Sequence, residues 1–195
     1  MGQRFSSITD RHRAFIEGQK IFFVASAAPE GRVNVSPKGM ATFRVLGPNE
    51  VAYLDCTGSG SETRAHLVGS GDRRLTIMFC AFGEPPLILR LYGQGQARMR
   101  GTPEYGALLR HFDEIPGARQ VVHLAVDLVQ ASCGMGVPLF DYRKDRPDLV
   151  RHWARQGADH LQKYWGAKNT TSIDGLPTQF EPATMAAPPG RHPAS

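Results

Sequence analysis

Hydroxyl side chains gather in one short segment of the chain, residues 57–63, which follows an apolar strand and leads into a helix. Four of these seven residues carry a hydroxyl: Thr57, Ser59, Ser61 and Thr63. The N–H groups of such a loop, its hydroxyls and the N-terminus of the following helix can all point at a phosphate. Gly/Ser loops are also common as plain turns. The segment alone therefore leaves a phosphate site and a simple turn both open.

A second polar segment, residues 34–39, lies about twenty residues upstream at the end of another predicted strand. It carries Ser36 and one cation, Lys38. A basic strand end beside a hydroxyl-rich one suits a phosphorylated cofactor. The alternative for Lys38 is a surface lysine at a turn.

Arg90 stands inside an apolar strand pattern, and a buried arginine must be paired. Its partner is either a bound cofactor or a carboxylate such as Asp55, and the sequence does not choose between them. Ser61 is a reasonable N-cap for the helix after the loop. Glu62 suits capping of the same helix better than a ligand contact.

Composition indicates an ordinary globular protein. The chain has 195 residues, 41% of them hydrophobic and 21% charged, which predicts one domain with a full core. No apolar run approaches the roughly 18 residues of a membrane span, and the N-terminus does not resemble a secretory signal. Three scattered cysteines predict no disulfide framework, and seven histidines without ligand spacing predict no metal site. We expect a cytoplasmic protein without a membrane partner.

The formal net charge is +5, which raises the question of nucleic-acid binding. The arginines are spread along the chain and do not alternate with aromatic residues, so a generally basic surface is the better interpretation. We expect no nucleic-acid partner.

Strands dominate the predicted elements. We expect them at residues 21–27, 32–36, 42–46, 51–56, 75–82, 87–99 and 121–129, the first buried on both faces. Helices are expected at residues 9–18, 62–68, from 102 and 147–164. Gly93 and Gly95 predict a bulge. The absence of a βαβ unit argues against a Rossmann domain, and the pattern predicts a mainly β, antiparallel barrel with flanking helices.

Six segments together resemble the FMN-binding split barrels related to pyridoxamine 5′-phosphate oxidase. The resemblance covers roughly residues 1–178 and leaves a Pro/Ala-rich tail, residues 179–195, which we expect to be disordered. The matching segments are 34–39 (NVSPKG), 53–63 (YLDCTGSGSET), 75–82 (LTIMFCAF), 90–93 (RLYG), 132–138 (SCGMGVP) and 172–177 (SIDGLP).

The resemblance implies a six-stranded barrel that forms a homodimer, with one FMN in each of two clefts between the subunits. Ser36 and Lys38 would then lie beside the flavin. Thr57, Ser59, Ser61 and Thr63 would face its phosphate and ribityl chain. Arg90 would take the arginine position of the strand that crosses the site.

The chain departs from true pyridoxamine phosphate oxidases at three places. Their Ser-Arg-Lys triplet is replaced by Ser61-Glu62-Thr63, their strand glutamine by Ile88, and their Arg-x-His element has no match. The resemblance therefore implies an FMN-dependent oxidoreductase for an unidentified small molecule and not pyridoxal phosphate synthesis.

Alternatives remain open: a flavin-binding or flavin-sensing protein without catalysis, or a haem- or deazaflavin-binding relative. His66 is a haem ligand in the haem alternative, but helix packing or solvent exposure suits it better. Cys133 suits a conformationally required small residue better than a reactive thiol near the flavin.

Overall fold

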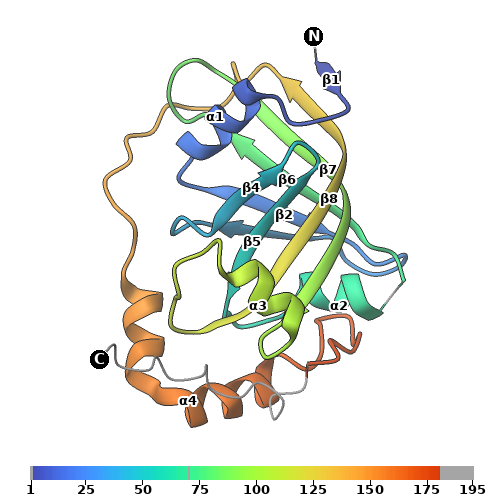
Figure 1. Cartoon of the computed structure of the whole chain (residues 1–195), viewed down its shortest axis with the longest axis vertical. Coiled ribbons are helices and arrows are strands. Elements are labelled where there is room, and N and C mark those ends of the chain that lie inside the picture. The colour runs from blue at the N-terminus through green and yellow to red at the C-terminus, as the bar shows by residue number, and fades with distance from the viewer. Residues whose placement is uncertain (1, 70, 181–195) are drawn as a thin grey trace.

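The structure, a computed structural model, describes residues 2–69 and 71–180. These residues form eight strands in one antiparallel sheet, ordered β3-β2-β6-β7-β8-β5-β4, with β1 paired to β8 (Figure 1). The strands are β1 Gln3–Phe5, β2 Phe22–Ser26, β3 Asn34–Lys38, β4 Phe43–Gly47, β5 Glu50–Cys56, β6 Arg74–Cys80, β7 Ile88–Met99 and β8 Ala118–Ser132. The helices are α1 Asp10–Gly18, α2 Glu62–Gly69, α3 Pro103–Leu109 and α4 Asp148–Lys168.

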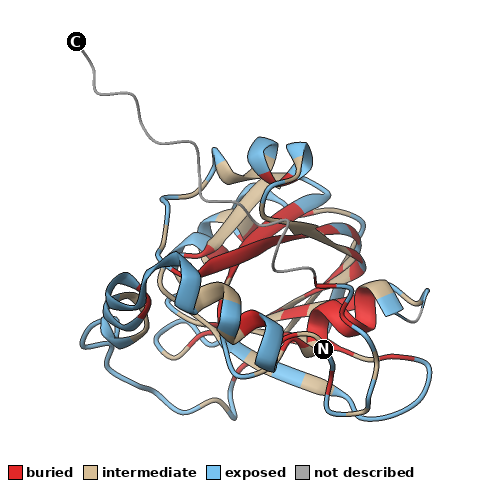
Figure 2. Ribbon diagram, turned by 90° about the horizontal axis from the view of Figure 1, so that it is seen from below, coloured by how far each residue is buried: buried red, intermediate tan, exposed pale blue. Residues whose placement is uncertain are grey.

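The sheet curls around a hydrophobic core and stays open between its end strands, β3 and β4. Buried side chains of five strands, β2, β5, β6, β7 and β8, meet inside, and Figure 2 shows the buried residues on the strands around this interior. The predicted antiparallel barrel class is confirmed. The described strands number eight and not the six that the resemblance implies: the seven strands expected from the sequence pattern correspond to β2–β8, and short β1 is an additional one.

Burial differs from expectation in two strands. The predicted two-sided burial of β2 is wrong: Phe22, Val24 and Ser26 are buried, whereas the residues between them are half-exposed. Strand β5 is instead buried on both faces, because Ala52 and Leu54 pack outward against Tyr105 of α3. An apolar run in the sequence does not show whether both faces of a strand are buried, because this depends on which element packs against the outer face.

The long strands β7 and β8 are bent at Gly93. Their register shifts between Tyr92 and Gly93, so the predicted bulge is present. A Cβ atom on Gly93 would lie 1.9 Å from the Ala125 carbonyl oxygen. Only glycine allows the two backbones this approach.

Local capping chemistry places two of the four described helix starts. Thr9 and His12 form a reciprocal capping box at α1, and the Thr102 hydroxyl caps α3 ahead of Pro103. The expected side-chain cap at α2 is wrong: the Ser61 carbonyl accepts the Ala65 N–H, but the Ser61 hydroxyl has no partner among the described residues. This hydroxyl is left for another contact.

Helix α4 and the loop after it, residues 148–180, form a C-terminal arm at the lower end of the barrel in Figure 1. The helix is kinked at Gly157, which has φ 75°. Phe180 is buried against Trp165, so packing continues through the first two residues of the predicted tail. The rest of that prediction, residues 181–195, lies outside the described residues.

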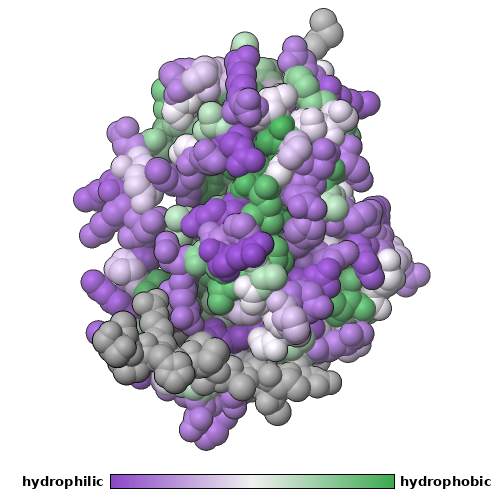
Figure 3. All heavy atoms as spheres, viewed as in Figure 1, coloured by the Kyte–Doolittle hydropathy of each residue, from purple (hydrophilic) through white to green (hydrophobic). Residues whose placement is uncertain are grey.

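Figure 3 shows hydrophobic side chains scattered among hydrophilic ones over the face of Figure 1. Within the described residues, no helix is long and apolar enough to cross a membrane. No group of three or more His, Cys, Asp or Glu side chains suited to holding a metal ion occurs there either.

Candidate functional site

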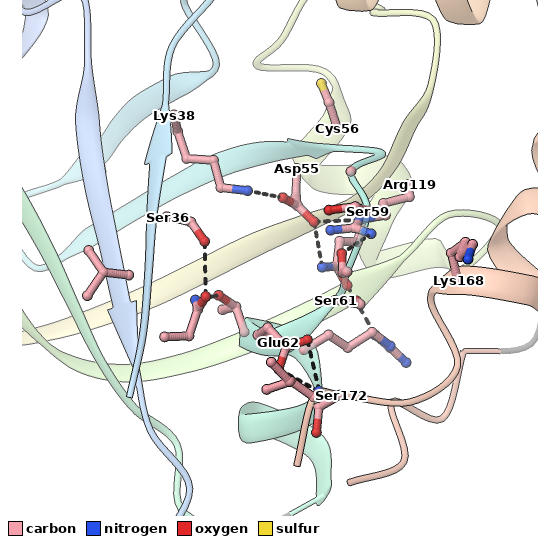
Figure 4. A pocket seen from close by; sticks show the side chains of 18 of the residues that line it. Ser36, Lys38, Asp55, Cys56, Ser59, Ser61, Glu62, Arg119, Lys168 and Ser172 are labelled. Atoms are coloured by element: carbon pink, nitrogen blue, oxygen red, sulfur yellow. Dashed lines mark hydrogen bonds and ion pairs between the residues drawn. The ribbon is translucent and has the colours of Figure 1, made fainter. Parts of the chain in front are cut away.

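A pocket of about 820 Å³ opens where β3, the end of β5, the loop at residues 57–61 and the C-terminal arm meet (Figure 4). This volume lies within the range of small-molecule sites. Five of the predicted site residues line the pocket: Ser36, Lys38, Ser59, Ser61 and Thr63. The fold therefore brings the basic strand end and the hydroxyl loop to one cavity.

Two predicted site residues lie elsewhere. The Thr57 hydroxyl donates to the Gly117 carbonyl oxygen at 2.6 Å and accepts from Trp165 Nε1 at 2.7 Å. Both contacts hold the loop in shape, and Thr57 is outside the pocket lining. Arg90 lies on β7, also outside the lining, and its guanidinium donates to Ser132 Oγ at 3.1 Å. Of the two partners that the sequence left open for Arg90, Asp55 is not the one that the structure shows, because Asp55 pairs with Lys38 and Arg119.

Asp55 instead accepts hydrogen bonds from three other pocket residues. Its carboxylate is 2.6 Å from Lys38 Nζ, 2.8 Å from Arg119 Nε and 2.8 Å from Gln120 Nε2. Burial acts to raise the pKa of Asp55, but the charges of Arg119 and Lys38 outweigh it and hold the pKa well below its usual range. Asp55 is therefore an ionised carboxylate shared by two cations.

Arg119 was missed from sequence. It is buried at the start of β8, and its Nη1 also donates to the Gly60 carbonyl and to Asn169 Oδ1, both at 2.8 Å. The sequence could have indicated it through the pair Arg119-Gln120 at the start of an apolar strand, because such polar side chains are uncommon in a buried strand. Arg119 thus joins β5, the hydroxyl loop and the C-terminal arm.

Thr63 links the start of α2 to the β3 side of the pocket. Its hydroxyl accepts from Asn34 Nδ2 at 3.2 Å and from Ser26 Oγ at 3.4 Å. Asn34 in turn accepts from the Ser36 hydroxyl at 3.2 Å. These contacts orient two predicted site hydroxyls, Ser36 and Thr63, relative to each other.

The C-terminal arm supplies one wall of the pocket through Lys168, Thr171, Ser172 and Ile173. Glu62 accepts the Ile173 N–H at 3.1 Å, so its expected capping role is replaced by a contact with the arm. Arg32, which lines the pocket, forms an ion pair with Asp174 of the arm.

Two thiols differ in their surroundings. Cys56 lines the pocket, where burial and then Asp55 raise its pKa to about 11. This thiol is protonated at neutral pH and is a poor nucleophile. Cys133 is exposed and lies outside the pocket lining.

His66 is buried in α2, with Nδ1 at 3.0 Å from Ser26 Oγ. The expected helix-packing role is confirmed, and His66 lies outside the pocket lining.

The charge of the pocket favours an anion. Five cationic side chains and two carboxylates line it: Arg32, Lys38, Arg64, Arg119 and Lys168 against Asp55 and Glu62. Two of the lining residues, Ser61 and Arg64, each have a buried polar atom, Oγ and Nε, without a hydrogen-bond partner in the described part of the chain. Buried polar groups are normally satisfied, so these atoms fit a polar, negatively charged ligand.

Comparison with known proteins gives a consistent family. Residues 8–133 match the family model described as pyridoxamine 5′-phosphate oxidase. The pyridoxamine 5′-phosphate oxidase family protein ustO of Aspergillus flavus is 39% identical over 193 residues, covering 89% of this chain and 76% of that protein.

Two solved structures are similar to this chain. HupZ of Group A Streptococcus matches at 20% identity with a TM-score of 0.51, over 64% of this chain and 99% of that one. At this identity the likeness to HupZ concerns the fold alone. A pyridoxamine 5′-phosphate oxidase-related, FMN binding protein of Nostoc punctiforme matches at 13% identity with a TM-score of 0.44, over 65% and 81% of the two chains.

Proposed function

Because this chain belongs to the pyridoxamine 5′-phosphate oxidase family, we propose that its pocket binds FMN and that the protein is an FMN-dependent oxidoreductase acting on a small molecule. The observation that carries the proposal is the convergence of Lys38 with the Ser59 and Ser61 hydroxyls on one cationic cavity. A bound flavin supplies hydride or electron transfer, and the protein supplies binding and orientation.

The pocket residues fit FMN in kind. Ser59, Ser61 and the backbone of the loop offer donors for a phosphate or for ribityl hydroxyls. Lys38 approaches from β3, and Asp55 fixes its Nζ at 2.6 Å. Asp55 is buried and bonded to two cations, so its main contribution is to position them.

The substrate of this oxidoreductase is a small molecule other than pyridoxamine phosphate. Glu62 and Thr63 occupy the helix start where the resemblance implies an Arg-Lys pair, and Glu62 is turned to the arm. The proposal therefore keeps flavin redox chemistry but expects a different substrate, because the pocket lacks the Arg-Lys pair that the resemblance implies.

Absorbance spectra of the purified protein test the proposal. The expected result is a yellow protein with flavin bands, which bleach on addition of NAD(P)H or substrate under anaerobic conditions. A Soret band in place of flavin bands would identify haem and contradict the proposal. A deazaflavin-binding protein would take up that cofactor and leave FMN free.

A flavin-binding protein without catalysis is the second candidate. It is favoured by the absence of histidine from the described lining of the pocket and by the raised pKa of Cys56. Flavin that binds tightly but is not bleached by any reductant or substrate would select this candidate.

We also propose that the protein is a homodimer that covers the pocket. Val33 and Val35 are 68% and 60% exposed, and both lie at the pocket mouth. Phe23 and Met78 are half-exposed on the neighbouring strands β2 and β6. A second copy packed on this apolar face would bury it and close the pocket. A cytoplasmic location stays part of the proposal, and the three cysteines are free thiols, as that compartment requires.

A further inference from the structure

We infer that Arg64, together with Ser61, binds the phosphate dianion of the pocket ligand and so replaces the cations that residues 62 and 63 lack. This inference rests on the proposed FMN site and adds to it a residue outside every motif of the resemblance. Arg64 is in the first turn of α2, three residues after Ser61, which places the two side chains on one side of the helix.

Arg64 is a buried cation without a counter-ion. The residue is 4% exposed. Its guanidinium donates to three neutral acceptors: Gln120 Oε1 at 3.3 Å, the Gln179 carbonyl at 3.0 Å and Met99 Sδ at 2.8 Å. Among the described residues it forms no ion pair with a carboxylate. A buried charge without a partner is costly, so an anionic ligand would stabilise this site.

The unused donors of this pair are also buried. Ser61 and Arg64 are among the residues that line the pocket, and each has a buried polar atom, Ser61 Oγ and Arg64 Nε, without a hydrogen-bond partner in the part of the chain that the structure describes. Ser61 is 2% exposed, so bulk water does not satisfy its hydroxyl. A phosphate offers several acceptor oxygens that one guanidinium and one hydroxyl can share.

The other cations of the pocket are already balanced in part. Lys38 and Arg119 share the charge of Asp55. Gln120 connects this network to Arg64, because it donates to Asp55 and accepts from Arg64. Burial, and then the charge of Arg119, lower the pKa of Arg64 to about 10, so Arg64 stays cationic at neutral pH. A phosphate, with a charge of about −2, fits this surplus of positive charge.

A purely structural role is the competing explanation. Arg64 contacts the Gln179 carbonyl, and its guanidinium lies 5.8 Å from the centre of the Phe180 ring. It would then hold the C-terminal arm and touch no ligand. The two roles differ in one measurable way, because only a phosphate ligand distinguishes FMN from riboflavin, the same flavin without phosphate.

The experiment measures the dissociation constants of FMN and riboflavin by flavin fluorescence quenching, with the full chain. Arg64→Met is expected to weaken FMN binding about 10- to 100-fold and to leave riboflavin binding unchanged. Arg64→Lys keeps the charge and should recover part of the FMN affinity. Ser61→Ala, which removes one donor, should weaken FMN binding less than Arg64→Met. The matched control is Arg110→Met, an exposed arginine at the end of α3, which should change neither constant.

An equal loss of FMN and riboflavin affinity would assign Arg64 to structure and overturn the inference, as would unchanged FMN affinity. If Arg64→Met does not fold, Arg64→Lys and Ser61→Ala are used instead, and the loss of FMN affinity is again compared with the loss of riboflavin affinity.

Failure of the proposed function is a separate outcome. If the wild-type protein binds neither flavin, its thermal unfolding with inorganic phosphate is compared between wild type and Arg64→Lys. A phosphate-dependent rise in Tm in the wild type that shrinks in the variant would retain the anion site without FMN, and equal shifts or none would overturn the inference too.

Discussion

Asp55 is the residue on which the charge balance of the pocket depends. One buried carboxylate is shared by Lys38 and Arg119. Removing it would leave two cations in a pocket where Arg64 is already without a carboxylate partner among the described residues. Both the stability of the apo protein and the position of Lys38 are therefore expected to depend on Asp55.

Asp55→Asn is expected to destabilise the protein by about 3 kcal/mol, because breaking a buried ion pair leaves uncompensated charge. Urea unfolding followed by tryptophan fluorescence measures this. The control is Asp72→Asn, which alters a carboxylate paired with the exposed Arg74 and should cost far less. A similar cost for both variants would contradict the role given to Asp55.

Acid should destabilise the wild type through the same carboxylate. The folded-state pKa of Asp55 is lowered, with the cations overcoming the effect of burial. Its stabilisation is therefore fully present above the unfolded-state pKa, about 3.9, and is lost as pH falls toward the lower folded-state pKa. Unfolding free energy measured between neutral pH and pH about 3 should fall more steeply in the wild type than in Asp55→Asn. Parallel curves would show that Asp55 does not set the acid limit.

At the scale of elements, the C-terminal arm shapes the loop that faces the pocket. Trp165 and Trp153 both donate to Thr57, and Asn169 Nδ2 donates to the Gly58 carbonyl at 3.2 Å. These residues follow the segment that the family model matches, residues 8–133. The hydroxyl loop therefore depends on an element outside the matched barrel.

Trp165→Phe is expected to lower stability by about 2 kcal/mol, because it removes the donor to the buried Thr57 hydroxyl and leaves unfilled volume. Thermal unfolding measures the change. Tyr164→Phe is the matched control in the same helix turn, since it keeps its ring against Trp153 and should stay within about 0.5 kcal/mol of the wild type. Equal Tm values for the two variants would contradict the supporting role of Trp165.

At the scale of the whole molecule, the exposed apolar face of the sheet beside the pocket is the surface that we propose binds a second copy. The exposed Val33 and Val35 border the pocket, so dimerisation and ligand binding should be linked. A copy bound over this face would shield the ligand from water, and ligand binding would in turn favour the dimer.

Val35→Asp is expected to convert the dimer to a monomer, because it would place a charge in the apolar contact. Sedimentation velocity over a range of concentrations measures the change. Leu139→Asp is the control, since Leu139 is 66% exposed and lies outside the pocket lining. A wild type that sediments as a monomer throughout, or two variants with equal effects, would contradict the proposed interface.

Much of this protein follows from its sequence alone, because the signals are local. Alternation of side chains and turn residues specify the strands, and Thr9 and Thr102 specify helix starts through contacts three residues away. The hydroxyl loop and the basic strand end were recognisable for the same reason: each is a continuous segment whose residue types suit an anion.

Tertiary structure alone decided which of those groups face the pocket and what their partners are. Thr57 is turned to Trp165, over a hundred positions later in the chain, and Asp55 to Arg119 and not to Arg90. Arg64 donates hydrogen bonds to two neutral groups, the Gln120 side chain and the Gln179 carbonyl, and it has no carboxylate partner among the described residues. Hydrogen bonds and charge balance inside a barrel join distant segments, and neither composition nor spacing records which of them meet.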